Sequence, residues 1–369
     1  MSIEEQNGEE SLDIPRPLLD MAVGNDPPIG PDMAARVAVA ADLAAPLWER
    51  LEAFEDVTDS EVGDTTLTRA RNIERGAGMR QLFLKFEGGN PTGTQKDRIA
   101  FAQVMDAMRR GYDTVTVATC GNYGAAMALA ASIAGLRCVI YVPANWTPRR
   151  VGEMAAAGAE LVRVDGDYEE AVGRSMARAA QDEFYDGNPG GTNTSIQLQA
   201  YAQIAVEIYD ELRDAPAMVA VPMSNGTTLA GIHKGFLSLY RRGKTSRIPR
   251  IVGSSSFRKN PIVYAFRKGL GAVADLDPRR IHETAVNEPL INWHSIDGDL
   301  GLEAIRASGG FAADTSDRAM VALARRVREQ EGLSVLPAST AGLAALLAHH
   351  EKAGLPGDRY VAVLTGRKA

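Results

Sequence analysis

Short runs rich in β-branched residues alternate with amphipathic stretches from residue 81 to the end of the chain. Seven runs are predicted as strands, at 82–86, 114–118, 137–142, 161–164, 218–221, 250–253 and 360–364. Apolar spacings of three and four predict helices at 99–110, 125–134, 149–157, 168–184, 196–212, 229–242, 317–331 and 340–353. This alternation predicts an α/β fold with parallel-rich sheets flanked by helices. Small-molecule sites in such folds lie in the loops that follow the strands.

The first sixty residues differ from the rest, because prolines and acidic residues interrupt any regular pattern. We predict an N-terminal arm over residues 1–60 with one short helix near 34–52. The length of 369 residues suggests two domains beyond this arm, and 45% hydrophobic with 24% charged residues indicates a folded chain.

Charge and cysteine content exclude several classes of function. The net charge of −7 argues against a nucleic-acid partner, which requires a concentrated basic surface. No apolar run has the length of a membrane span, and the acidic start does not resemble a signal peptide, so we expect no membrane association and a cytoplasmic location. The two cysteines, Cys120 and Cys138, and five scattered histidines predict neither a disulfide framework nor a metal site.

Four segments that follow predicted strands are rich in Gly, Asn, Ser and Thr. The first, 87–98, places Lys96 at the start of a helix, where the positive end of the macrodipole disfavours an ammonium. The neutral amine favoured there is the form that a Schiff-base lysine needs. The second, 119–124, offers backbone amides and Asn122 to an anion such as a carboxylate. The third, 224–228, combines amides and hydroxyls at a helix start and suits a phosphate. The fourth, 364–366, ends the last predicted strand.

Taken in order, these segments resemble the pyridoxal-phosphate (PLP) enzymes of fold type II, the tryptophan-synthase-β-like family, and within it the threonine synthases. The run Asn90-Pro-Thr-Gly-Thr-Gln-Lys-Asp-Arg98 is similar to the family's cofactor-lysine segment, and Gly63-Asp-Thr-Thr-Leu67 resembles an upstream Gly-x-Thr-Pro-Leu element. Pro337-Ala-Ser-Thr-Ala-Gly342 is similar to the family's Glu-Pro-Ala-Ser segment. The resemblance covers roughly residues 60–369.

The resemblance implies a role for each segment. Lys96 would carry the cofactor as an internal aldimine and act as the general base, and Asn122 would bond the cofactor's phenolate oxygen. Thr365 would face the pyridine nitrogen, and a hydroxyl there leaves the ring uncharged, which favours elimination and replacement over transamination. The cofactor phosphate would lie on Ser224, Asn225, Gly226, Thr227 and Thr228. The substrate would contact Thr119, Cys120, Gly121, Tyr123, Asn193 and Thr194.

Several positions depart from the threonine synthase pattern near the implied site. Gln95 stands where phenylalanine is usual, Cys120 replaces a hydroxyl residue, and Tyr123 replaces a small one. The stretch 190–198 lacks the arginine expected to grip a substrate phosphate, which leaves hydrogen bonds from Asn193, Thr194 and Ser195, or the late Arg367, as alternatives.

The expected activity is therefore PLP-dependent elimination or replacement on an amino acid, threonine-synthase-like, with O-phosphohomoserine or a related activated amino acid as substrate. A β-replacement synthase of the cysteate or cysteine type, a serine or threonine β-eliminating deaminase and a non-catalytic PLP-binding paralogue stay open. The resemblance also implies a homodimer. It further implies a large PLP-binding domain of residues 61–96 and 196–369 and a small mobile domain of residues 97–195.

Overall fold

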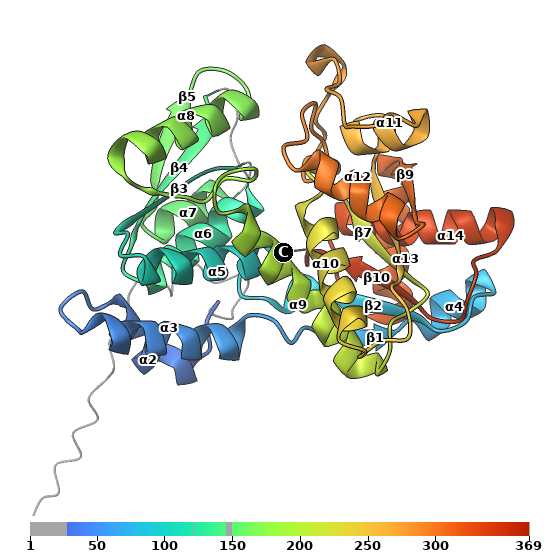
Figure 1. The fold of residues 1–369 in the computed structure, drawn as a ribbon, viewed down its shortest axis with the longest axis horizontal. Coiled ribbons are helices and arrows are strands. Elements are labelled where there is room, and N and C mark those ends of the chain that lie inside the picture. Colours follow the sequence, from blue (N-terminus) through green and yellow to red (C-terminus); the bar gives the residue numbers. More distant parts are fainter. Residues whose placement is uncertain (1–27, 120, 145–149, 369) are drawn as a thin grey trace, which may run out of the picture.

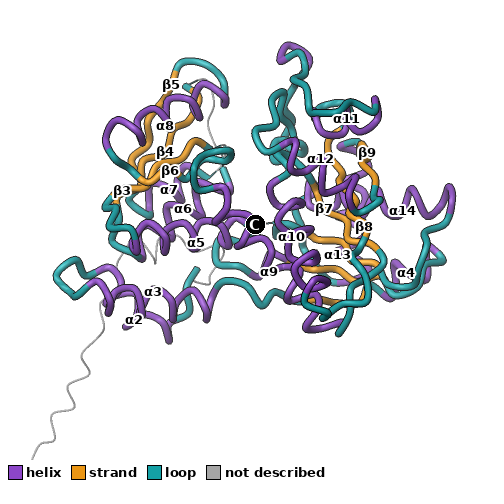
Figure 2. Tube along the Cα trace, viewed as in Figure 1, coloured by secondary structure: helices purple, strands orange, loops and turns teal. Residues whose placement is uncertain are grey.

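The computed structural model describes residues 28–119, 121–144 and 150–368. Two separate β-sheets, each with helices packed on it, form its two halves (Figures 1 and 2). The smaller sheet uses only residues between 114 and 186, whereas the larger sheet takes strands from both sides of that segment. The predicted α/β fold with parallel-rich sheets is confirmed.

The larger sheet has six strands in the order β1-β2-β10-β7-β8-β9. Their bounds are β1 Leu67–Arg69, β2 Leu82–Phe86, β10 Tyr360–Leu364, β7 Met218–Pro222, β8 Arg250–Ser256 and β9 Phe311–Thr315. Only the β1–β2 pair is antiparallel. Both faces are buried, because Val219 and Val221 pack with the core under one helix layer while Met218 and Ala220 pack with the core under the other.

The smaller sheet has four parallel strands in the order β5-β4-β3-β6. These are β3 Thr114–Ala118, β4 Arg137–Pro143, β5 Glu160–Val164 and the two-residue β6 Tyr185–Asp186. Helix α6 (Asn122–Ile133) covers one face and α8 (Tyr168–Asp182) the other. A capping box of Asp167 and Glu170 starts α8, as expected for Asp followed three residues later by Glu.

The remaining helices complete the two halves. They are α4 Arg71–Ala77, α5 Lys96–Arg109, α7 Val151–Ala156, α9 Thr194–Leu212, α10 Thr227–Arg241, α11 Pro261–Lys268, α12 Gly298–Ala307, α13 Asp317–Glu331 and α14 Ala341–Ala353, with short 3-10 turns η1 Pro31–Met33, η2 Glu87–Gly89, η3 Pro278–Arg280 and η4 Pro337–Thr340. None of the helices in the described part of the chain is long and apolar enough to cross a membrane. Of the predicted helix 149–157, residue 149 lies outside the described residues.

The N-terminal arm is more regular than its sequence predicts. In place of one helix near 34–52, the structure has α2 (Ala34–Ala41) and α3 (Leu47–Glu61). The break has a local cause, because Asp42 accepts a hydrogen bond from the amide of Ala44 and Pro46 cannot continue a helix. Both helices pack against the smaller half, with α2 on α6 and α3 on α5.

A cluster of four buried charges joins the elements on either side of the site. Arg98 on α5 contacts Glu87 in η2 (Nε–Oε2 2.6 Å) and Glu207 on α9 (Nη1–Oε1 2.6 Å). Lys85 on β2 contacts the second carboxylate oxygen of Glu207 at 2.5 Å. The four side chains are between 0% and 13% exposed, so the two cations and two anions neutralise one another away from solvent.

Removing Arg98 should destabilise the fold strongly, since Arg98→Met would leave Glu87 buried without its cation. We expect a loss of about 3–5 kcal/mol in the free energy of unfolding, measured by urea denaturation. The control is Arg109→Met on the same helix, where an exposed pair with Glu55 at 3.8 Å predicts a change within about 0.5 kcal/mol. Equal effects of the two substitutions would contradict this account of the cluster.

Candidate active site

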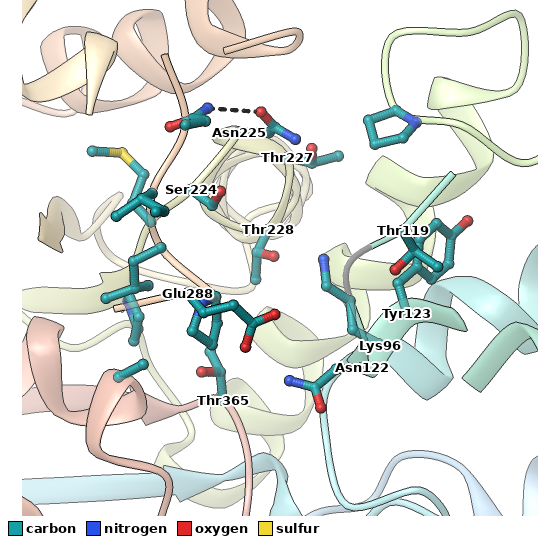
Figure 3. Close-up of a pocket in the computed structure, with 18 of the residues that line it drawn as sticks. Lys96, Thr119, Asn122, Tyr123, Ser224, Asn225, Thr227, Thr228, Glu288 and Thr365 are labelled. Carbon is teal, nitrogen blue, oxygen red and sulfur yellow. Dashed lines mark hydrogen bonds between the residues drawn. The ribbon is translucent and has the colours of Figure 1, made fainter. Parts of the chain in front are cut away.

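A cavity of about 460 Å³ lies between the two halves, lined by loops that follow strands of both sheets. Residues after β3, β7 and β10 meet there, together with the first residues of α5 (Figure 3). This is the position expected for a ligand site in parallel α/β sheets. Most of the residues predicted for the site therefore come together, although some, such as Lys96 and Thr365, are far apart in the sequence.

Lys96 is the first residue of α5, and its amine points into the cavity (Figure 3). Its Nζ lies 3.3 Å from the hydroxyl oxygen of Tyr201 on α9. The ring centroids of Tyr123 and Tyr201 lie 5.7 and 5.8 Å from the same nitrogen. Two aromatic faces thus confine the amine.

The loop after β3 carries Thr119, Gly121 and Asn122 to the cavity wall. Cys120, predicted to contact the substrate, lies outside the described residues. The hydroxyl of Thr119 accepts the amides of Gly121 and Gly124 at 3.3 and 3.2 Å, so it stabilises the start of α6.

The side-chain amide of Asn122 has a defined orientation. Its Oδ1 accepts a hydrogen bond from Arg150 at 3.2 Å, and Arg150 is itself held by Glu153 and by the carbonyl of Thr92. Because the oxygen is occupied by a cation, the NH₂ group is left to donate into the cavity (Figure 3).

Tyr123 lines the cavity with its ring but not with its hydroxyl. The hydroxyl donates to the carbonyl of Gly187 at 2.7 Å and accepts from Gln103. Burial raises the pKa of Tyr123, so the phenol stays neutral. Its predicted contact with substrate is therefore restricted to the ring face.

Ser224, Asn225, Gly226, Thr227 and Thr228 connect β7 to the N-terminus of the fifteen-residue helix α10. Gly226 has a φ of +94°, and a Cβ there would lie 3.0 Å from Ile262 Cδ1 and 3.2 Å from the Asp297 carbonyl oxygen. Glycine is thus required for the turn. Free amides at a helix start, with hydroxyls beside them, form an anion-binding arrangement.

Side chains around this loop are fixed by neighbouring segments. Thr227 donates to Asp297 Oδ2 at 2.6 Å, and Asn225 Oδ1 accepts from Asn292 at 2.9 Å (dashed in Figure 3). Burial raises the pKa of Asp297, while the bond from Thr227 lowers it.

Thr365 directly follows β10 at the opposite end of the cavity from Ser224 (Figure 3). Its hydroxyl oxygen lies 3.2 Å from that of Ser339 in η4, and either can be the donor. The Ser339 hydroxyl oxygen also lies 3.2 Å from the carbonyl oxygen of Gly366, so its one proton can go to either acceptor. The sequence analysis singles out segment 337–342, but only the structure shows that Ser339 within it contacts Thr365.

Asn193 and Thr194 do not line the cavity. Asn193 is buried, donating to the carbonyl of Asp186 at 2.8 Å and accepting from Arg110 at 2.8 Å. Thr194 donates to the carbonyl of Gly191 at 3.0 Å, and Ser195 is exposed. These side chains organise the start of α9, so the arrangement does not support the prediction that they contact substrate.

Several lining residues have no counterpart in the sequence prediction, among them Tyr201 and Glu288. Tyr201 could be assigned to the site by its position on α9 only if the packing of α9 against α5 were already known. Glu288 belongs to the long irregular connection between α11 and α12, and no motif surrounds it.

The donor set fits PLP. A lysine amine, a phosphate-sized turn of amides and hydroxyls at the N-terminus of α10, an oriented amide and a hydroxyl pair face one cavity. Gly226 fits the turn because a side chain there would collide with Ile262 and with the backbone of Asp297. Lys96, Asn122, residues 224–228 and Thr365 are the groups able to hold the cofactor.

Comparison with known proteins agrees with this chemistry. The family model "Pyridoxal-phosphate dependent enzyme" matches residues 58–366. The chain belongs to this family of PLP-dependent enzymes, with PLP as its cofactor. Within it, the chain is a threonine-synthase-like lyase of fold type II.

Among curated proteins, the chain is similar to threonine synthase of Methanocaldococcus jannaschii, with 30% identity over 87% of this chain and 79% of the relative. Threonine synthase of Methanosarcina acetivorans is 31% identical over 79% of this chain and 71% of the relative. Among solved structures, maize serine racemase superposes with a TM-score of 0.72 at 18% identity, covering 86% of this chain and 92% of that chain, which supports the fold.

A side chain at Gly226 should weaken cofactor binding. In Gly226→Ala the left-handed backbone strains an L-residue by about 1–3 kcal/mol, and the crowded Cβ displaces the turn. We expect the PLP dissociation constant, measured by absorbance titration, to rise at least about tenfold.

The control is Gly243→Ala, near the other end of α10, with φ +66° and open space around its Cβ. It introduces backbone strain without touching the turn, so PLP affinity should stay unchanged. Equal losses of affinity would contradict the role of the turn.

Proposed function

We propose that this protein catalyses elimination or replacement at the side chain of an α-amino acid, using PLP held by Lys96. The observation that carries the proposal is the position of the Lys96 amine, which faces one cavity with the 224–228 turn and Thr365. When bound, PLP supplies an electron sink that makes loss of the Cα proton possible. The chain's own groups then decide where the substrate lies and where protons go.

Each lining group has a role in the proposal. Lys96 binds the cofactor covalently and moves the proton at the substrate's Cα. Asn122, oriented by Arg150, donates to a cofactor oxygen, and the turn at the start of α10 holds the phosphate. The hydroxyl of Thr365 would face the ring nitrogen, and with Ser339 as the donor of their pair the Thr365 proton is left for an uncharged nitrogen. Amides after β3 bind the substrate carboxylate.

The proposal extends to the organisation of the protein. We assign residues 61–96 and 196–369 to the cofactor-binding domain and residues 97–195 to a smaller domain that closes on the substrate. The negative net charge of the protein favours a cytoplasmic location. The resemblance to fold type II enzymes favours a homodimer.

Two substrate groups have support. The relatives named threonine synthase favour O-phosphohomoserine. Asn193 and Thr194, which could have bound a substrate phosphate, do not line the cavity. Their positions favour a second group of substrates, amino acids that carry a hydroxyl or another leaving group without a phosphate, as in β-elimination or β-replacement. A titration of the holoenzyme with O-phosphohomoserine, O-phosphoserine, serine and threonine separates them.

Loss of Lys96 should abolish the covalent link. We expect the purified protein to show the visible absorbance band of lysine-bound PLP, and borohydride reduction followed by mass spectrometry to locate the cofactor on Lys96. Lys96→Ala should lose the band and at least about a thousandfold of turnover. Lys234→Ala, an exposed lysine on α10, should change neither. Full activity in Lys96→Ala would refute the assigned role of Lys96, whereas a wild type that binds PLP on Lys96 but turns over none of the amino acids would favour a non-catalytic PLP-binding protein.

Thr365→Asp should change the products. A carboxylate beside the ring nitrogen would keep it protonated and stabilise negative charge at Cα for longer, which favours transamination. We expect a larger fraction of the cofactor to be converted to its amine form, measured by chromatography after single turnovers. Thr365→Ser keeps the hydroxyl and should behave like the wild type; unchanged products in Thr365→Asp would refute the assigned partner.

A further inference from the structure

The charges around the cavity have one dominant sign. Four acidic residues line it, namely Asp167, Glu169, Glu283 and Glu288. Over the described residues of the lining, Lys96 is the sole lysine, arginine or histidine, and in the proposed function its amine would be taken up by the cofactor. Burial raises the pKa of Glu169 to about 7, so this carboxylate is mostly ionised at pH 8. A substrate therefore enters a negatively charged environment.

Glu288 is an acidic residue that lies among the groups proposed to hold the cofactor. Its carboxylate points into the cavity towards Lys96 and Asn122, on the side where Thr228 lies (Figure 3). Oε1 lies 3.6 Å from the position that a Cβ on Gly121 would take, so Glu288 stands against the loop after β3. It is half-buried, and it comes from the connection between α11 and α12 in the other half of the molecule.

Three arginines of the described residues are candidates to bind a substrate phosphate, and each is engaged elsewhere. Arg110 bonds Asn193, and Arg150 is held by Glu153 and the carbonyl of Thr92. Arg367 donates to the carbonyls of Gly88 and Pro91, both at 3.2 Å, and does not line the cavity. None of these three arginines replaces the phosphate-binding arginine that the stretch 190–198 lacks.

We propose that Glu288 is a specificity-determining residue that selects α-amino acids with a hydroxyl or amino group at Cβ or Cγ and excludes a phosphate at that position. The inference rests on the proposed function and names its substrate class. A hydroxyl or ammonium donates to the carboxylate, whereas a phosphate beside it places like charges together in a partly desolvated cavity.

The test compares matched ligand pairs on the holoenzyme at pH 8. Dissociation constants are measured by calorimetry and by the change in cofactor absorbance. The ligands are L-homoserine against O-phospho-L-homoserine, L-serine against O-phospho-L-serine, and L-2,4-diaminobutyrate as the cationic member. We expect the wild type to bind each unphosphorylated ligand at least about tenfold more tightly than its phosphorylated partner.

Glu288→Gln keeps the size of the side chain and removes its charge. We expect it to reduce the discrimination at least about fivefold, through tighter binding of the phosphorylated ligand and weaker binding of diaminobutyrate. Glu303→Gln, an exposed residue on α12, makes the same change in net charge outside the cavity and should leave the ratios unaltered.

Three outcomes would overturn the inference: tighter binding of the phosphorylated ligands by the wild type, unchanged ratios in Glu288→Gln, or a holoenzyme that binds none of the ligands. Failure of the proposed function looks different, because PLP would then not be found on Lys96 by mass spectrometry before any ligand is added.

Discussion

The buried cluster of Arg98, Glu87, Glu207 and Lys85 is the constraint on which the site depends. Arg98 lies two residues after Lys96, and its guanidinium is held by carboxylates from η2 and α9. The same contacts fix where α5 begins relative to β2 and α9. Because the Lys96 amine is positioned by the first turn of α5 and touches Tyr201 on α9, the cluster sets both the direction of the amine and its nearest neighbour.

The groups at the cavity come from different parts of the chain, and hydrogen bonds away from the cavity define what each offers. Asn122 presents its NH₂ because Arg150 takes its oxygen, and Thr365 is paired with Ser339. Tyr123 offers only a ring, since Gly187 and Gln103 occupy its hydroxyl. The chemical character of the site thus depends on partners that do not touch the ligand space.

Seven of the ten strands in the described residues were predictable from sequence, because buried parallel strands are continuous apolar runs and the loops after them need Gly, Ser and Thr. The edge strands β1, β6 and β9 were not predicted. Lys96, Asn122, the 224–228 turn and Thr365 follow from that pattern together with the resemblance, and all line one cavity. The same resemblance predicted that Asn193 and Thr194 contact substrate, but they do not line the cavity, because local composition cannot distinguish a ligand-binding residue from one that organises a helix start. Glu288 lies in an irregular connection whose path depends on tertiary contacts, so no periodicity could place it.

The order of strands in the larger sheet has a consequence for biosynthesis. Strand β10 lies between β2 and β7 in the sheet, so these two earlier strands cannot be joined into one sheet until β10 has been synthesised. The smaller sheet uses a continuous segment, and all of its strands leave the ribosome well before. Folding during synthesis can therefore complete the smaller sheet first, whereas the larger sheet closes only when the final strand inserts between edges that have stayed open.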